Sequence, residues 1–148
     1  MTKEYLSVIV VEEDEGTQIF FKNIFADLKI KTKVLFFSNG KDGVDYLMKE
    51  DALVPEVLFM NYDFPEKNSL ELIDQVKENF RYNKMTTVLY SECLSEHEIE
   101  EIFVKGINVF MKKQNNYSNL KKAVTEIITV NWQYYTSGLN KENFIMKV

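Results

Sequence analysis

Polar side chains that can bind a cation or an anion follow three apolar runs of this sequence. Glu12 and Glu13 come directly after the first run, Asn61 after the second, and Lys113 shortly after the third. Carboxylate and amide oxygens are ligands for a hard cation such as Mg²⁺, and a nearby lysine offsets the repulsion between adjacent carboxylates. The spacing predicts an acidic pocket if the three runs end at the same edge of the fold. Glu12 and Glu13 also suit the start of a helix, whose dipole favours negative charge.

The elements expected to position these residues alternate between buried strands and amphipathic helices. The strand segments are short apolar runs without a polar face, and the helical segments carry apolar residues three and four apart. The pattern predicts strands over 5–11, 33–38, 57–60, 86–90 and 107–111, with helices from 17 and over 42–50, 68–80, 95–105 and 118–130. This alternation predicts an α/β, flavodoxin-like (βα)5 fold, a doubly wound parallel five-stranded sheet with helices on both faces. In such sheets ligands bind beyond the carboxyl ends of the strands, where the acidic pocket would form.

Composition excludes several classes of protein. The length of 148 residues and the hydrophobic content of 45% suit one soluble domain with a real core. The net charge of -5 argues against a nucleic-acid partner. No apolar stretch approaches the roughly 18 residues of a membrane span, and the N-terminus shows no secretory segment. A single cysteine, Cys93, predicts a reducing cytoplasmic location, and a single histidine argues against a zinc site.

The motifs, taken in order, resemble the receiver domain of bacterial two-component response regulators over about residues 5–130. That family carries an acidic pair after the first strand and a phosphoacceptor aspartate after the third, with a proline four residues later. A serine or threonine ends its fourth strand, an aromatic residue lies in the fifth, and a lysine follows. The matching positions are Glu12-Glu13, Asn61 with Pro65, Ser91, Phe110 and Lys113. The resemblance implies that Ser91 contacts a phosphoryl group, that Phe110 is a switch aromatic, and that Lys113 pairs with the acidic pocket.

The departures from the family pattern concern the chemistry itself. The phosphoacceptor position holds Asn61, whose neutral amide cannot attack a phosphodonor. The loss of one carboxylate takes the pocket from about -3 to -2 and lowers its Mg²⁺ affinity. Glu12 and Glu13 replace the usual aspartates and reach one methylene further. Gln114 stands where the family has a proline after a cis bond, and we expect a trans bond because cis would cost roughly 2.5–4 kcal/mol.

The resemblance implies a metal site made by Glu13, Asn61 and the backbone carbonyl of Asp63. We expect Mg²⁺ to bind weakly there, with no cofactor required. Asp63 is also a candidate substitute nucleophile, but it lies two residues before Pro65 instead of four, which favours a role as a loop or turn residue.

Three other family positions also suit purely structural roles. Ser91 could bond to backbone at a strand end, and Phe110 could simply pack in the sheet. Lys113 could offset the charge of the two glutamates whether or not a phosphoryl group is present.

The last part of the chain differs from the rest. We expect a receiver-like domain over 1–130 and an aromatic-rich C-terminal extension over 131–148, packed on the domain or in a homodimer contact. The alternative is that the last helix simply continues and shields its own core. The aromatic residues of the extension are Trp132, Tyr134, Tyr135 and Phe144.

The functional expectation is a single-domain, phosphorylation-deficient protein-interaction module of two-component (phosphorelay) signalling. Its partner would be a sensor histidine kinase or another signalling protein, and it would not be an enzyme beyond autophosphorylation at most. One alternative is a conventional phosphoacceptor receiver that uses Asp63 or another residue with Mg²⁺. A second is an unrelated small α/β enzyme or flavin carrier, because this fold hosts many functions.

Overall fold

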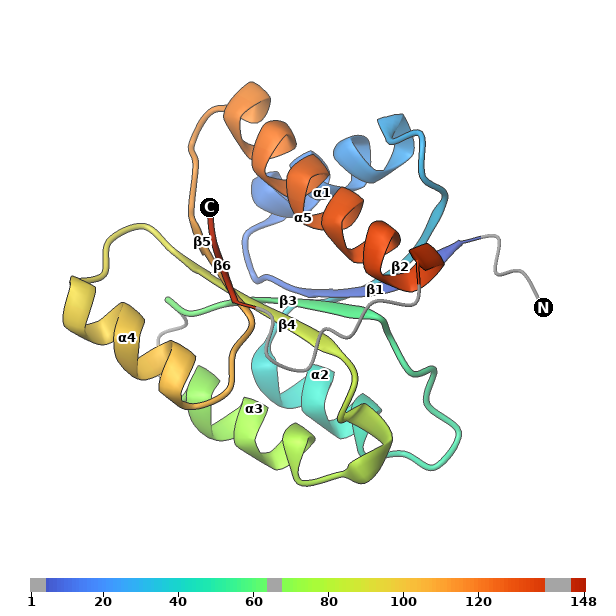
Figure 1. The fold of residues 1–148 in the computed structure, drawn as a ribbon, viewed down its shortest axis with the longest axis vertical. Helices are drawn as coiled ribbons and strands as arrows, with labels where there is room; N and C mark the ends of the chain where they lie inside the picture. The colour runs from blue at the N-terminus through green and yellow to red at the C-terminus, as the bar shows by residue number, and fades with distance from the viewer. Residues whose placement is uncertain (1–4, 64–67, 138–144) are drawn as a thin grey trace.

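The computed structural model describes residues 5–63, 68–137 and 145–148, with side chains of 135–137 excepted. Its centre is a sheet of six strands in the order β2-β1-β3-β4-β5-β6, and every neighbouring pair is parallel (Figure 1). The strands are β1 Leu6–Val11, β2 Thr32–Phe37, β3 Val57–Asn61, β4 Thr86–Ser91, β5 Val109–Lys112 and β6 Met146–Lys147.

Helices cover both faces of the sheet. On one face lie α1 and α5, and on the other lie α2, α3 and α4 (Figure 1). The helices are α1 Glu15–Asp27, α2 Gly40–Leu47, α3 Ser69–Lys77, α4 Glu96–Val104 and α5 Tyr117–Ser137, with a short 3-10 turn at Phe80–Tyr82. The predicted fold class is confirmed, and the sixth strand is an addition that the sequence pattern did not predict.

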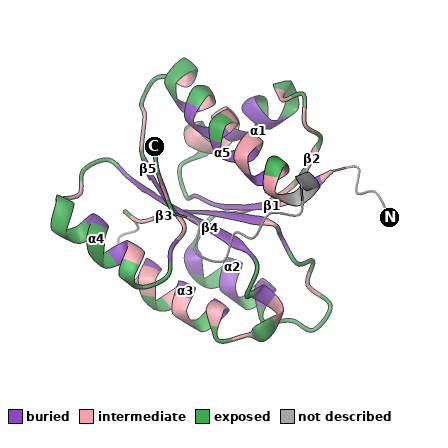
Figure 2. Cartoon of the chain, viewed as in Figure 1, coloured by how far each residue is buried: buried purple, intermediate pink, exposed green. Residues whose placement is uncertain are grey.

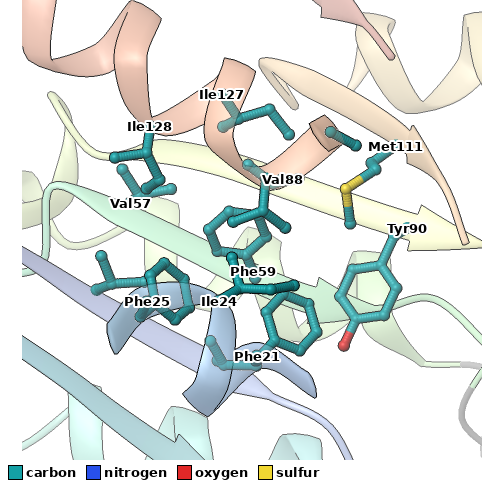
Figure 3. Close-up of a cluster of buried hydrophobic side chains, with 14 of the residues drawn as sticks. Phe21, Ile24, Phe25, Val57, Phe59, Val88, Tyr90, Met111, Ile127 and Ile128 are labelled. Atoms are coloured by element: carbon teal, nitrogen blue, oxygen red, sulfur yellow. The ribbon is translucent and has the colours of Figure 1, made fainter. Parts of the chain in front are cut away.

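The core consists of two apolar layers, one on each face of the sheet, because side chains of a strand alternate between its faces. Figure 2 shows the central strands as almost continuously buried. Figure 3 shows the layer beneath α1 and α5, where Phe21 packs against Phe59 and Tyr90 at ring distances of 5.6 and 5.7 Å. The opposite layer includes Leu58, Ile102 and other side chains beneath α2, α3 and α4.

Helix ends follow the capping signals of the sequence. The predicted capping box is present, since Ser95 Oγ accepts from the Glu98 amide and the Glu98 carboxylate accepts from the Ser95 amide. Gly106 follows α4 with a φ of 96°, a conformation that glycine adopts without strain. Helix α1 begins at Glu15 and not at Thr17, because the Asp14 carboxylate accepts from the Thr17 amide at 2.8 Å and caps it.

Helix α5 crosses the domain boundary expected at residue 130. It continues to Ser137, and Asn131 is only 1% exposed. Thr86 Oγ1 donates to Asn131 Oδ1 at 2.6 Å, which ties this part of α5 to the start of β4. Trp132 packs against the core layer of α1 and α5. Residues 131–137 therefore continue the last helix, and the side chain of Tyr135 and all of Phe144 lie outside the described residues.

The C-terminal residues extend the sheet beside β5. The Met146 amide donates to the Asn108 carbonyl at 2.8 Å and the Val148 amide donates to the Phe110 carbonyl at 2.9 Å. The Lys112 amide donates back to Val148, and Lys147 Nζ lies 3.1 Å from Glu96 on α4. Residues 146 and 147 thus pair with β5 of the same chain. Among the described residues, no helix is long and apolar enough to cross a membrane.

Candidate functional site: a polar network at the strand ends

The predicted pocket residues meet at one edge of the sheet because β1, β3, β4 and β5 are parallel neighbours. Glu12 follows the last residue of β1, and Asn61 and Ser91 are the last residues of β3 and β4. Lys113 follows β5, where its amide donates to the Ser91 carbonyl at 2.8 Å. The parallel order therefore places at adjacent strand ends residues that are about 100 positions apart in the sequence.

Glu12 is the buried centre of this site, with 0% of its surface exposed. Its carboxylate accepts from Tyr90 Oη at 2.8 Å, from the Asp14 amide at 3.0 Å, and from Asn61 Nδ2 at 3.2 Å to each oxygen. A carboxylate removed from water requires such donors, and here the protein itself supplies them.

Asn61 uses both ends of its amide and is 4% exposed. Nδ2 donates to Glu12, while Oδ1 accepts from the Asp63 amide at 2.8 Å. The backbone carbonyl of Asn61 also accepts from Ser69 Oγ at 2.9 Å, which ties the end of β3 to the start of α3. An ionised aspartate could accept these bonds but could not donate to Glu12, so the amide suits this position.

Asp63 and Ser91 form the outer part of the network. Ser91 Oγ donates to one Asp63 carboxylate oxygen at 2.6 Å, and the Glu92 amide donates to the other at 3.0 Å. Ser91 is fully buried, whereas Asp63 is exposed. The hydroxyl that we expected to contact a phosphoryl group is thus bonded to a carboxylate of the same chain.

Glu13 and Lys113 stand apart from this network. Glu13 is exposed, and Lys113 forms no ion pair with either of the two glutamates that we expected it to offset. The Lys113 charge acts instead on Asp14. Hydrogen bonds from Thr17 are the main reason that the Asp14 pKa lies below its ordinary value, and Lys113 adds a smaller effect in the same direction.

Two of the residues expected at the Mg²⁺ site, Asn61 and Asp63, have side chains engaged in hydrogen bonds within the protein. Asn61 turns its nitrogen, not its oxygen, toward Glu12, and the Asp63 carboxylate faces Ser91 and Glu92. Within residues 5–63, 68–137 and 145–148, no group of three histidine, cysteine or acidic side chains could hold a metal ion.

Tyr90 is a site residue that the sequence reasoning missed. It is fully buried, and burial raises the pKa of its hydroxyl well above the ordinary value, with the nearby Glu12 charge as the second cause. Strand alternation could have identified it: Tyr90 pairs in register with Asn61, so both side chains lie on the sheet face of α1 and α5. Its neighbour Ser91 points to the opposite face.

Phe110 and Gln114 lie beyond the network, on the side of α4. Phe110 is 4% exposed and packs in the core layer of α2, α3 and α4. The bond between Lys113 and Gln114 is trans, as expected, since the described residues contain no cis peptide bond.

The comparisons with known proteins agree on one family. The family model for the response regulator receiver domain matches residues 8–125. The chain is 23% identical over 123 residues to a chemotaxis protein CheY homolog of Campylobacter jejuni, covering 83% of this chain and 92% of that protein. It is 20% identical over 123 residues to the probable methanogenesis regulatory protein FilR2 of Methanothrix harundinacea, covering 81% and 79%.

Solved structures support the same fold. The phosphorylated cyanobacterial phytochrome response regulator RcpA aligns with a TM-score of 0.76 at 18% identity, over 92% of this chain and 97% of that one. A response regulator from Thermotoga maritima aligns with a TM-score of 0.65 at 22% identity, over 84% and 98%. The strand-end site, the sheet order and the family match over residues 8–125 lead to one conclusion: this chain belongs to the response regulator receiver domain family of two-component signalling.

Proposed function

We propose that this receiver is a phosphorylation-deficient interaction module, which signals by binding a protein partner and not by accepting a phosphoryl group. The observation that carries the proposal is the amide of Asn61, which is bonded at both ends where the family has its phosphoacceptor carboxylate. An amide is a poor nucleophile. The Asn61 nitrogen is also engaged in hydrogen bonds to buried Glu12.

The other carboxylates of the site also support this proposal. Glu12 is buried and accepts bonds from Tyr90, Asn61 and the Asp14 amide. Asp63 accepts one bond on each of its oxygens, so an attack on a phosphodonor would first require these bonds to break. The module would require no metal, since its proposed action is to bind a protein and not to transfer a phosphoryl group.

The partner would be a sensor histidine kinase or another signalling protein of the cytoplasm. An exposed free thiol at Cys93 fits a reducing compartment. The pairing of β6 with β5 of the same chain favours a tail that acts within one protomer, and light scattering on the full chain would test a homodimer.

The experiment is treatment with acetyl phosphate and Mg²⁺, read by intact-mass spectrometry on the native chain, Asn61→Asp and Asp63→Ala. We expect no phosphoryl adduct on the native chain and on Asp63→Ala, and an adduct on Asn61→Asp, which restores the nucleophile. Labelling of the native chain that Asp63→Ala abolishes would instead establish the conventional alternative with Asp63 as acceptor. Native labelling that persists in Asp63→Ala would point to another acceptor and would equally overturn the proposal.

A further inference from the structure

Two hydrogen-bond donors at the end of β4 converge on one carboxylate. Ser91 Oγ lies 2.6 Å from Asp63 Oδ1, and the Glu92 amide nitrogen lies 3.0 Å from Asp63 Oδ2. A hydroxyl and a backbone N–H from consecutive residues thus bind the two oxygens of a single anion. Charge-assisted bonds of this kind are roughly twice as strong as neutral ones. Because Ser91 is fully buried, its hydroxyl has little access to water as a substitute partner.

Asp63 is held in this position by Asn61. The Asp63 amide donates to Asn61 Oδ1 at 2.8 Å, and Asn61 Nδ2 in turn donates to Glu12. The bonds form one continuous path across the ends of β1, β3 and β4, which are adjacent in the sheet. The position of the Asp63 carboxylate is therefore set by the buried part of the site.

We propose that Asp63 is a built-in substitute for a bound oxyanion, whose carboxylate permanently occupies the donors of Ser91 and Glu92. Removal of this carboxylate would uncover a binding site for a small tetrahedral oxyanion such as inorganic phosphate. The inference deepens the proposed function and rests on it, because it explains how a receiver without a phosphoacceptor keeps these donors satisfied.

The consequence for signalling lies in the segment that follows β4. Glu92, Cys93 and Leu94 line a cavity of about 540 Å³, whose other walls include Phe110 and Lys112 of β5. The bond from the Glu92 amide to Asp63 fixes the start of this segment without any covalent modification. The same bond therefore links Asp63 to the segment that borders the face between α4 and β5.

The test is titration with inorganic phosphate, followed by amide chemical shifts, on the native chain, Asp63→Ala, the double variant Asp63→Ala/Ser91→Ala, and Glu13→Ala. Glu13 is the matched control, because it is an exposed acid at the same edge whose removal frees no donor. We expect saturable shifts centred on the Glu92 amide in Asp63→Ala, and none in the native chain or in Glu13→Ala. The double variant should bind phosphate at least about tenfold more weakly than Asp63→Ala does, since it lacks one hydrogen bond to a charged ligand.

Amide hydrogen exchange gives an independent reading on the same proteins. The Glu92 amide should exchange faster in Asp63→Ala than in the native chain, and phosphate should restore its protection. Absence of saturable binding by Asp63→Ala, equal binding by Glu13→Ala, or unchanged exchange at Glu92 would each overturn the inference. These outcomes concern non-covalent binding by a variant, so they are distinct from acetyl phosphate labelling of the native chain, which tests the proposed function.

Discussion

A single amide changes what this strand end can do. Asn61 donates to Glu12 and accepts from the Asp63 amide, whereas an aspartate could only accept. The amide at this position therefore supplies one of the donors that the buried Glu12 carboxylate requires. In the proposed function, the absence of a phosphoacceptor and the stability of the site depend on the same side chain.

Asn61→Asp should accordingly destabilise the protein. The variant places a second carboxylate against buried Glu12 and removes its donor, which should lower the free energy of unfolding by about 1–3 kcal/mol. Mg²⁺ should recover part of this loss, since two facing carboxylates can share a hard cation. Urea unfolding with and without Mg²⁺ measures both effects. The native chain is the control and should show no Mg²⁺ dependence, and a variant as stable as the native chain without Mg²⁺ would contradict this account.

The hydroxyl of Tyr90 should give stability a dependence on alkaline pH. Burial raises the pKa of this hydroxyl in the folded protein above its value of about 10 in the unfolded chain. The protonated hydroxyl therefore contributes its full stabilisation below a pH of about 10, and this contribution is lost as pH rises through the pKa of the folded protein. At neutral pH, Tyr90→Phe should cost about 1–3 kcal/mol, because Glu12 loses a buried donor.

The measurement is the difference in unfolding free energy between the native chain and Tyr90→Phe across pH 7 to about 11. The difference should shrink as pH rises above about 10. Tyr117→Phe is a suitable control, since the described contact of Tyr117 is a ring packed against Phe20 at 5.3 Å. A difference that stays constant with pH would show that ionisation of Tyr90 does not affect stability.

At the scale of elements, a cationic side chain closes the end of α2. Arg81 Nη1 donates to the Glu50 carbonyl at 2.7 Å, and Nη2 donates to the Leu47 and Lys49 carbonyls at 3.0 and 2.7 Å. Tyr82 Oη also donates to Leu47, at 2.6 Å. The turn after α3 thus satisfies carbonyls at and beyond the end of α2, which have no partner within that helix.

Arg81→Ala should lower the free energy of unfolding by about 1.5–3 kcal/mol, the range for hydrogen bonds to charged groups. Arg81→Lys should restore only part of this, because an ammonium cannot reproduce the planar fork of donors. Thermal or urea unfolding of both variants tests the prediction. Lys105→Ala is the control: its exposed ion pair with Asp74, at 3.7 Å, should change stability by less than about 1 kcal/mol. If Arg81→Ala matched this control, the cap would have no energetic role.

For the whole molecule, the C-terminal residues determine whether the sheet ends at β5 or beyond it. The Lys112 amide bonds to Val148, while the adjacent Lys113 amide bonds to Ser91 on the other side of β5. Without β6, the outer edge of β5 would present unpaired backbone groups, with which strands of other molecules can pair. Met146 and Lys147 therefore cover an edge of β5 through which molecules could otherwise associate.

Deletion of residues 145–148 should expose the Lys112 amide, whose acceptor is the Val148 carbonyl. Hydrogen exchange at Lys112 should become faster in the shortened chain, because its acceptor is gone, while Lys113 should keep its protection. The adjacent amide is an internal control for general loosening of β5. Equal protection of Lys112 in both chains would mean that β6 does not pair with β5 in solution.

The sequence predicted most of the fold because local signals and buried strands agree. Alternating apolar runs located the five strands of the core, and the pair Ser95 and Glu98 marked the start of α4. It could not predict β6, because Met146 and Lys147 form a strand only through the free edge of β5.

Only part of the candidate site could be predicted from the sequence. Placement of Glu12, Asn61 and Ser91 at strand ends follows from parallel topology, which the sequence pattern indicates. The bond between Asp63 and Ser91 joins residues 28 positions apart, through the position of the loop after β3 against the end of β4, which no local pattern reports. Tyr90 was within reach, since strand alternation puts it on the same face as Asn61.

The most direct test of the central claim is intact-mass spectrometry of the native chain after incubation with acetyl phosphate and Mg²⁺. The account predicts an unmodified mass, because Asn61 offers no nucleophile and the carboxylates of Glu12 and Asp63 are held by hydrogen bonds. A phosphoryl adduct that hydroxylamine removes, as expected for an acyl phosphate, would contradict it.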